Sequence, residues 1–210
     1  MFVPDDAYRL SFTTGGLLRA EAVAIAGLLV TEPDAATARA RAVELNLVQQ
    51  RTAASTARVT REVVQRVDEL PRAGVELVAH GSVDDSRQVM WLAACLRYRF
   101  LRDFGREVVR DRLLSGRNTV EHADFDMFWN LQSSWVDALR DAADSTRVRL
   151  RQNTFLMLRQ AGLLDDEGRV LPTNLSPGVA AVVAAAGDEL LLSFPIHDAQ
   201  VAALAGRDGA

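Results

Sequence analysis

The sequence predicts an all-α or nearly all-α fold, and three observations support this. Apolar residues recur every three or four positions through most of the 210-residue chain, as on the buried face of a helix. Residues that cap or stop helices stand at the ends of these segments. The hydrophobic content of 49% allows a substantial core. We expect two packed helical bundles: residues 1–117 form an N-terminal bundle, 118–204 form a C-terminal helical subdomain, and 205–210 form a disordered tail.

Three helices are predicted in the N-terminal third of the chain, over residues 17–30, 35–46 and 52–70. A Thr-Thr-Gly-Gly turn precedes the first, and Asp34 can cap the second. The buried stripe of the third consists of residues spaced by about one helical turn: Val59, Val63, Val67 and Leu70. Another side of this helix carries Arg51, Ser55, Arg58 and Glu62, and Pro71 ends the helix.

The middle of the chain predicts a strongly hydrophobic helix over residues 86–100, which Asp84 or Asp85 can cap. A short apolar segment at 74–79 precedes it. Its amphipathic continuation runs to residue 114, and Gly105 can bend or separate the two parts. From 118 to 143 the chain becomes acidic and aromatic, which favours short helices and a junction between the two bundles.

The C-terminal part predicts a helix over residues 145–161 that Gly162 ends, and a second helix that opens at Pro177. Between them, an Asp-Asp-Glu-Gly turn separates two apolar pairs that could form one small β-hairpin. The apolar run 190–194 predicts a short terminal strand. A helix followed by a hairpin is also the pattern of a winged helix, which stays open as an alternative.

No motif for covalent chemistry is found in the chain. It has no phosphate-binding glycine loop, no HExxH and no GxSxG sequence. The three histidines are far apart, and the single cysteine, Cys95, lies in an apolar run. We therefore expect no enzymatic activity, no cofactor and no metal site. The N-terminus lacks the pattern of a signal peptide and no segment is suited to span a membrane, which predicts a cytoplasmic protein.

All 24 basic residues are arginine, although the net charge is −4. A GC-rich genome explains most of this bias, but its physical consequence remains: every cation is a planar fork that can bind a phosphate through two hydrogen bonds. Because an acidic total charge does not itself predict nucleic-acid binding, the positions of the arginines decide the question.

Arginine is concentrated in two segments. Residues 87–117 contain eight arginines against three acidic residues, and residues 145–160 contain four arginines and no acid. Spacing on helices places several of them on shared faces. The predicted nucleic-acid-binding residues are Arg51, Arg58, Arg99, Arg102, Arg106, Arg110, Arg147, Arg149 and Arg151. The alternative is that Arg106 and Arg110 of the 99–110 stripe pair with Asp103, Glu107 and the acidic 118–144 segment.

That acidic segment also carries large aromatic side chains. Among them Phe128, Trp129 and Trp135 are predicted to bind a partner protein, because aromatic residues anchor many interfaces. The chain could therefore act as an adaptor between proteins as well as, or instead of, a nucleic-acid-binding protein.

Several segments, in this order and spacing, resemble the BrxA family. They are Tyr8-Arg9-Leu10-Ser11-Phe12-Thr13-Thr14-Gly15-Gly16-Leu17-Leu18, Glu44-Leu45-Asn46-Leu47-Val48-Gln49-Gln50-Arg51-Thr52, Ser55-Thr56-Ala57-Arg58, Trp91-Leu92-Ala93-Ala94-Cys95, Asp103-Phe104, Asp124-Phe125-Asp126 with Phe128, Ser145-Thr146-Arg147, and Gly162-Leu163-Leu164. The resemblance runs from about residue 8 to 196.

The resemblance has clear implications. It implies a helical protein similar to NusB-like bundles, without known enzymatic activity. It implies binding of double-stranded DNA and a role in phage restriction beside other proteins of a BREX system. The likeness to NusB-like proteins leaves RNA as an alternative ligand. The family supplies no catalytic residues to transfer, so the arginines named above rest on their positions alone.

Overall fold

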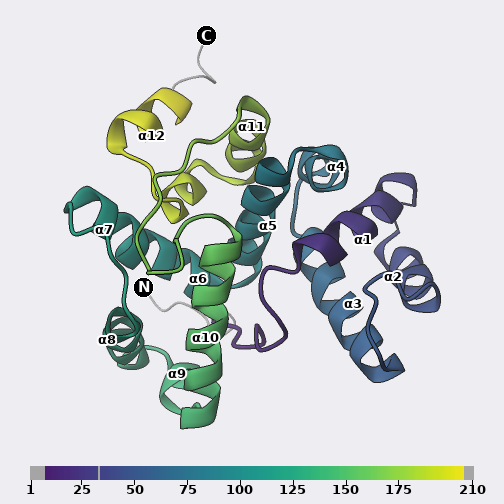
Figure 1. The fold of residues 1–210 in the computed structure, drawn as a ribbon, viewed down its shortest axis with the longest axis horizontal. Helices are drawn as coiled ribbons and strands as arrows, with labels where there is room; N and C mark the ends of the chain where they lie inside the picture. The colour runs from purple at the N-terminus through teal and green to yellow at the C-terminus, as the bar shows by residue number, and fades with distance from the viewer. Residues whose placement is uncertain (1–7, 33, 206–210) are drawn as a thin grey trace.

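The computed structural model describes residues 8–32 and 34–205, and helices dominate that part of the chain (Figure 1). The elements are α1 Arg19–Thr31, α2 Ala35–Glu44, α3 Ala53–Val67, α4 Arg72–His80, α5 Val83–Arg97, α6 Arg99–Phe104, π-helical η2 Gly105–Arg110, α7 Asp111–Leu114, α8 His122–Ser133, α9 Asp137–Arg140, α10 Asp144–Gln160, α11 Pro177–Ala186, the 3₁₀ helix η3 Asp188–Ser193 and α12 Asp198–Ala205. Residues 8–32 and 34–205 form no β-strand, so the all-α prediction is confirmed. The predicted disordered tail falls mainly on 206–210, outside the described residues.

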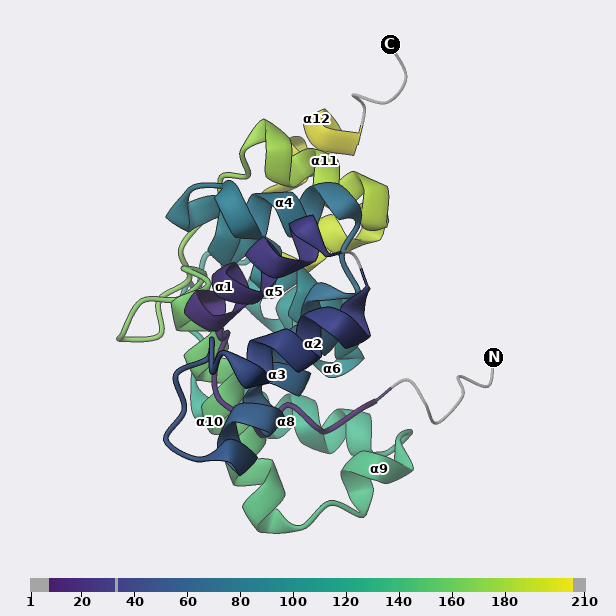
Figure 2. The same cartoon turned by 90° about the vertical axis from the view of Figure 1, so that its right-hand side faces the viewer.

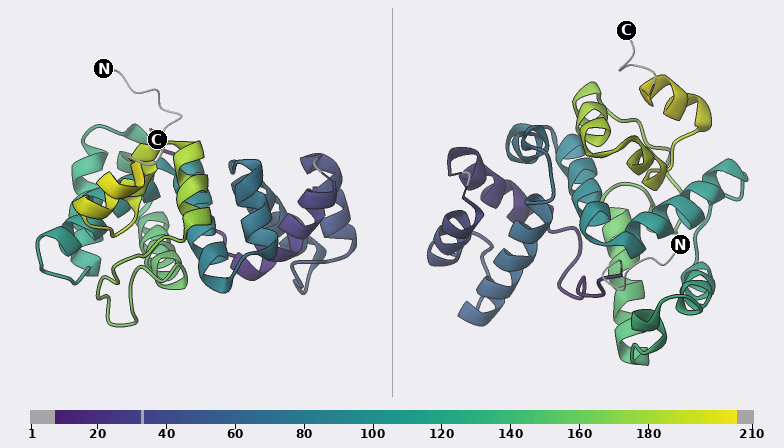
Figure 3. Two further views of the ribbon diagram at one scale, coloured as in Figure 1. Left: turned by 90° about the horizontal axis from the view of Figure 1, so that it is seen from above. Right: turned by 180° about the vertical axis from the view of Figure 1, so that it is seen from behind.

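Helix α5 is the centre of the molecule. It begins with a reciprocal capping box, in which Ser82 and Asp85 each bond the other's backbone N–H, and its residues from Ser86 to Cys95 are mostly buried. Helices α1–α4 lie on one side of α5, and α6–α12 lie on the other (Figures 1 and 2). The views from above and behind show the same arrangement (Figure 3).

An aromatic cluster packs α6 against α8. The Phe100 ring lies 5.2 Å from Phe128 and 5.7 Å from Trp129, centroid to centroid, and Phe104 lies 5.4 Å from Phe128. Offset and edge-on contacts of this kind add to the free energy gained by burying the rings. Two of the three aromatic residues predicted to bind a partner, Phe128 and Trp129, are therefore core residues at 5% and 4% exposure.

Two short segments differ from the sequence prediction. Residues 74–79 belong to α4, which Pro71 opens from its N-cap position. The run at 190–194, predicted as a strand, forms η3 through residue 193; Leu190 and Leu191 are buried there. A short apolar run does not by itself distinguish a strand from a helix, because most of its side chains are apolar and too few polar positions remain to reveal a period of two or of 3.6 residues.

The predicted β-hairpin is not formed. Leu164 and Val170 make only an isolated antiparallel bridge, and a second bridge joins Thr119 to Arg169. The Val170 N–H donates to the Asn118 carbonyl at 2.8 Å, which is a partner outside the expected hairpin. Pro172, two residues after Val170, has no N–H with which to extend a ladder.

Gly105 sits at the start of η2, where the chain has no room for a side chain. A Cβ atom there would lie 2.6 Å from the Ser193 carbonyl oxygen, which also accepts a hydrogen bond from Trp91 Nε1 at 3.1 Å. The six residues of η2 form wider π-helical turns. Side chains before and after η2 therefore do not keep the angular spacing of a continuous α-helix.

Candidate nucleic-acid interface

The outer face of α3 is basic: the only acid within the helix, Glu62, is buried, and the exposed Asp68 stands at the C-cap, two turns beyond Arg61. Arg58 and Arg61 are exposed and three residues apart, so they are neighbours on the helix surface. Arg51 is exposed just before the N-cap residue, Thr52. Within the described part of the chain, none of these three arginines forms an ion pair with an acid. We call Arg51, Arg58 and Arg61 the α3 face.

The loop that leads into α3 is held in one conformation by Asn46. The Asn46 side chain accepts from the Gln50 N–H and donates to the Gln50 carbonyl, both at 3.1 Å, and also accepts from Thr56 Oγ1 at 2.9 Å. Asn46 and Gln49 adopt positive φ of 47° and 49°, a conformation that asparagine tolerates better than most residues. Arg51 therefore projects from an ordered loop.

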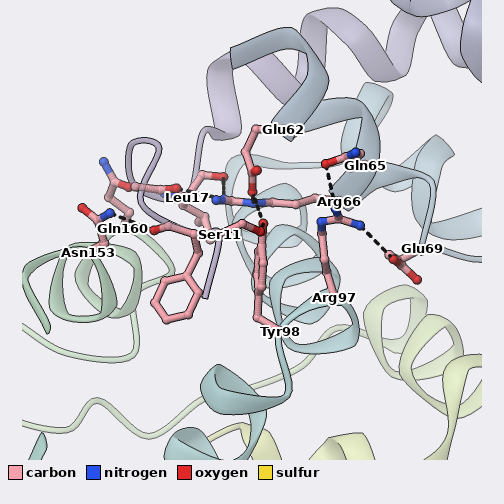
Figure 4. A network of polar contacts seen from close by, with 12 residues as sticks. Ser11, Leu17, Glu62, Gln65, Arg66, Glu69, Arg97, Tyr98, Asn153 and Gln160 are labelled. Atoms are coloured by element: carbon pink, nitrogen blue, oxygen red, sulfur yellow. Dashed lines mark hydrogen bonds and ion pairs between the residues drawn. The ribbon is translucent and has the colours of Figure 1, made fainter. Parts of the chain in front are cut away.

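The inner side of α3 is fixed by a buried polar network (Figure 4). Arg66, with no exposed surface, donates to Glu62 at 2.8 Å and to the carbonyls of Gly16 and Leu17 at 2.9 and 3.3 Å. Tyr98 of the α5–α6 junction donates to the same Glu62 carboxylate. Burial, and then the charge of Glu62, raises the pKa of Tyr98, which keeps its hydroxyl a donor. Glu62 is therefore part of the buried network, although its spacing in the sequence predicted that it lies on the same side of the helix as Arg58.

The same network holds the N-terminal segment between the two halves of the molecule. The Leu17 N–H donates to Gln160 Oε1 at 2.6 Å, and Asn153 donates to the Phe12 carbonyl at 2.8 Å, both from α10. Arg97 donates to Gln65 at 2.7 Å, which links α5 to α3 (Figure 4). The α3 face is therefore carried by a helix that is bonded to the rest of the molecule, so its arginines keep a fixed spacing.

Arg147 and Arg151 of α10 share a single acidic partner. Arg147 bonds Asp126 Oδ1 through Nε at 3.1 Å and Nη2 at 2.9 Å, and Arg151 bonds the other oxygen at 2.6 Å. The Arg147 guanidinium also lies 6.0 Å from the centre of the Trp129 ring. No acid lies within their own segment, but α8 supplies one across the fold. Their geometry is that of a clamp between α8 and α10.

The arginines at 99–110 are mostly paired as well. Arg99 bonds Asp103 at 3.1 Å and lies over the Tyr8 ring, and Arg102 lies 3.6 Å from the same carboxylate. Arg110 donates to the Ile196 carbonyl at 3.1 Å and pairs with Asp198. The alternative predicted Asp103 as a partner of Arg106 and Arg110, but Arg99 and Arg102 pair with it instead and Arg110 pairs with Asp198. The predicted single stripe is interrupted by η2.

Seven of the nine predicted arginines lie outside the α3 face. Of these seven, Arg106 and Arg149 are exposed and have no acidic partner among the described residues. They lie on different elements, η2 and α10. Arg61 is not among the nine predicted arginines, although its spacing of three residues from Arg58 places both on one helix face.

The three predicted partner-binding residues differ in their exposure. Trp135 is 80% exposed just beyond α8, whereas Phe128 and Trp129 lie in the aromatic cluster. Only Trp135 of the three is placed to touch another molecule.

With the geometry described, comparison with known proteins identifies the family. A sequence model of BrxA matches residues 6–187. The chain belongs to the BrxA family. The resemblance seen in the sequence is therefore confirmed over most of the chain.

Two BrxA relatives and one solved structure resemble the chain. A BREX protein BrxA from Escherichia coli O9:H4 (strain HS) is 27% identical over 196 residues, which cover 92% of each chain. A BREX protein BrxA from Bacillus cereus (strain H3081.97) is 21% identical over 127 residues, 60% of this chain and 64% of the relative. The crystal structure of an uncharacterized protein from Magnetospirillum magneticum superposes with a TM-score of 0.74, at 22% identity, over 90% of this chain and 98% of that one. This last likeness concerns the fold.

None of the described helices combines the length and the apolar character that crossing a membrane requires.

Proposed function

We propose that this BrxA-family chain is a non-enzymatic accessory protein of a BREX phage-defence system and that it binds duplex DNA through arginine–phosphate contacts. The BREX names of its relatives support the biological setting. The α3 face supports the DNA contact. Three exposed guanidinium groups lie on one helix and its entry loop, and none of them pairs with an acid among the described residues. This arrangement suits a polyanion with regularly spaced charges.

The lack of an acidic partner for the arginines of the α3 face, within the part of the chain that the structure describes, is the observation that carries the proposal. Arg58 and Arg61 repel each other at a cost of a few tenths of a kcal/mol. On α10, by contrast, Asp126 removes the corresponding cost for Arg147 and Arg151. An uncompensated pair of cations on an exposed helix face is consistent with a surface whose counter-charge comes from a ligand.

The proposed function is tested by titrating the full chain into a fluorescently labelled duplex and following anisotropy over a range of salt. If phosphate contacts dominate, affinity falls steeply as salt rises, because each contact displaces condensed counterions. Binding should depend little on duplex sequence. No binding at ~50 mM salt, or affinity that does not change with salt, would contradict the proposal.

Competition with RNA decides between two nucleic acids. The NusB-like resemblance in the sequence left RNA open, and an A-form helix presents its phosphates with a different groove geometry. An unlabelled DNA duplex should displace the labelled duplex at lower concentration than an RNA duplex of the same sequence. The reverse order would make the chain an RNA-binding protein.

A second candidate function is that of an adaptor between BREX proteins. The specific observation in its favour is the exposure of Trp135, because a tryptophan left 80% open to water is typical of a contact surface. Co-expression with the other proteins of the system tests it. A complex that co-purifies with the wild-type chain, and is weakened by Trp135→Ala while DNA binding persists, would support this function.

A further inference from the structure

An apolar stripe runs along the outer side of α8 and continues beyond its end. Met127, Leu131 and Trp135 are spaced by four residues, and they are 71%, 58% and 80% exposed. These are among the most exposed large apolar side chains of the described residues. Singly exposed apolar residues are common on proteins, but two one turn apart on a helix face and a third just beyond the helix end are typical of an interface.

The stripe borders an open groove of about 430 Å³ between α8 and the η2–α7 segment. On the α8 side the lining is apolar apart from Asp124, with Met127, Phe128 and Leu131. Val108 adds an apolar residue from η2. Helices α7 and α8 lie on the same side of the molecule, away from α3 (Figure 1). A groove between two helices has the shape that accommodates a third helix.

The other wall of the groove is acidic. Glu107 and Asp111 line it, one helical turn apart, and neither pairs with an arginine in the described part of the chain. Gln132 donates to Glu107 only at 3.5 Å. Burial, and then the negative charge of Asp103, raises the pKa of Glu107, so a cation beside it would relieve an unfavourable environment.

The charges at the far end of the groove are largely balanced. Arg112 pairs with Asp124 there, and the exposed Arg117 lies beside them. The uncompensated charge thus consists of two carboxylates on one wall against one arginine at the end. Duplex DNA is a poor match for an acidic wall. A second copy of the chain is also a poor match, because self-pairing would bring four carboxylates together with only two Arg117 side chains.

We propose that this groove binds an amphipathic, basic helix of a partner protein, with apolar side chains on Met127 and Leu131, lysine or arginine facing Glu107 and Asp111, and Trp135 available beside the groove. The inference rests on the adaptor function proposed above and gives it a location and a partner chemistry. The site lies on a different face from α3, so one molecule can hold DNA and a partner at once.

The test uses the full chain and two synthetic helical peptides. Both carry leucine at i, i+3/i+4 and i+7; one has lysine at its flanking positions and its twin has glutamate. The lysine peptide should bind the wild-type chain, and the glutamate twin should bind about tenfold more weakly or not at all. Equal binding of the two peptides would overturn the charge assignment.

Paired variants locate the binding site. Met127→Gln with Leu131→Gln should weaken the lysine peptide about tenfold, whereas Val83→Gln, at a residue 60% exposed on α5, should not. Glu107→Gln with Asp111→Asn should weaken it severalfold, and the control Glu44→Gln with Asp68→Asn should leave it unchanged. Unaltered binding to the groove variants, with their helical circular dichroism intact, would refute the site.

The groove and the adaptor function fail in different ways. If the wild-type chain co-purifies with another BREX protein and the Met127/Leu131 variant does so equally well, the adaptor function stands and the groove proposal is wrong. If no BREX protein co-purifies but the lysine peptide binds as described, the groove stands and the adaptor function is wrong. A wild-type dimer that dissociates in the Met127/Leu131 variant would assign the groove to a second copy and overturn the basic-helix proposal.

Discussion

Two arginine pairs on two helices have similar spacing and opposite surroundings. Arg58 and Arg61 on α3 face water without an acid, whereas Arg147 and Arg151 on α10 share the two oxygens of Asp126. The sequence around the second pair, residues 145–160, contains no acid, yet its charge is neutralised from a helix about 20 residues upstream. Surface potential therefore depends on which acids the fold brings near, and local charge counts do not reveal it.

The same contrast occurs within α3 itself. Arg61 is exposed, and five residues later Arg66 is completely buried and donates to three groups: the Glu62 carboxylate and the carbonyls of Gly16 and Leu17. Both residues are arginines on one helix. The first is free to meet a ligand and the second fixes the helix to the core, which makes them a matched pair for mutation.

The largest expected effect is on stability and comes from Arg66. Arg66→Met leaves the buried Glu62 carboxylate without its cation, and we expect the free energy of unfolding to fall by about 3–5 kcal/mol. The control, Arg61→Met, should change it by less than about 0.5 kcal/mol. Urea unfolding at neutral pH measures both. A loss below about 1 kcal/mol for Arg66→Met would show that the network contributes little to holding α3.

A second variant makes the two arginine pairs alike. Asp126→Asn removes the charge shared by Arg147 and Arg151 and should cost only about 1 kcal/mol of stability, because all three side chains are partly exposed. If the freed arginines reach phosphate, the slope of log K against log salt should become steeper by up to about 1.8. Affinity for duplex DNA should rise at low salt. An unchanged slope would mean that α10 lies outside the DNA footprint.

The smallest effect is expected from exposed arginines outside the α3 face. Arg106→Gln with Arg149→Gln removes two uncompensated charges on η2 and α10, and should change the salt slope by less than about 0.5 if they make only long-range contributions. Anisotropy titration under the conditions used for the wild type measures the change. A slope change near 1.8 would extend the contact surface to these elements.

Most helices could be predicted from the sequence because their signals are local. The stripe Val59, Val63 and Val67 is buried as its spacing predicts. The cap residue Asp34 and the terminal glycine Gly162, with φ of 73°, also lie where expected. Capping and amphipathic periodicity each involve residues within one or two turns, so a single sequence contains them.

The site was harder to predict because it depends on contacts between distant residues. Nothing within residues 145–160 reveals that Asp126 neutralises Arg147 and Arg151. The burial of Glu62 depends on Tyr98, 36 residues away in the chain. Likewise, the sequence predicts that Phe128 and Trp129 are exposed together with Trp135, whereas in the structure both rings pack against Phe100. The amino-acid types indicated the chemistry of the site, but contacts in the folded chain decide which arginine and aromatic side chains remain exposed to bind a ligand.

The salt dependence of DNA binding by two matched variants tests the central claim most directly. One is Arg51→Gln with Arg58→Gln and Arg61→Gln; the other is Arg147→Gln with Arg151→Gln. We expect the first to lower the magnitude of the slope of log K against log salt by about 2.7 and to lose most of its affinity. The second should keep the wild-type slope to within about 0.5, because Asp126 already neutralises its arginines. A wild-type slope in the α3 variant together with a reduced slope in the α10 variant would contradict the account and move the DNA-binding surface to α10.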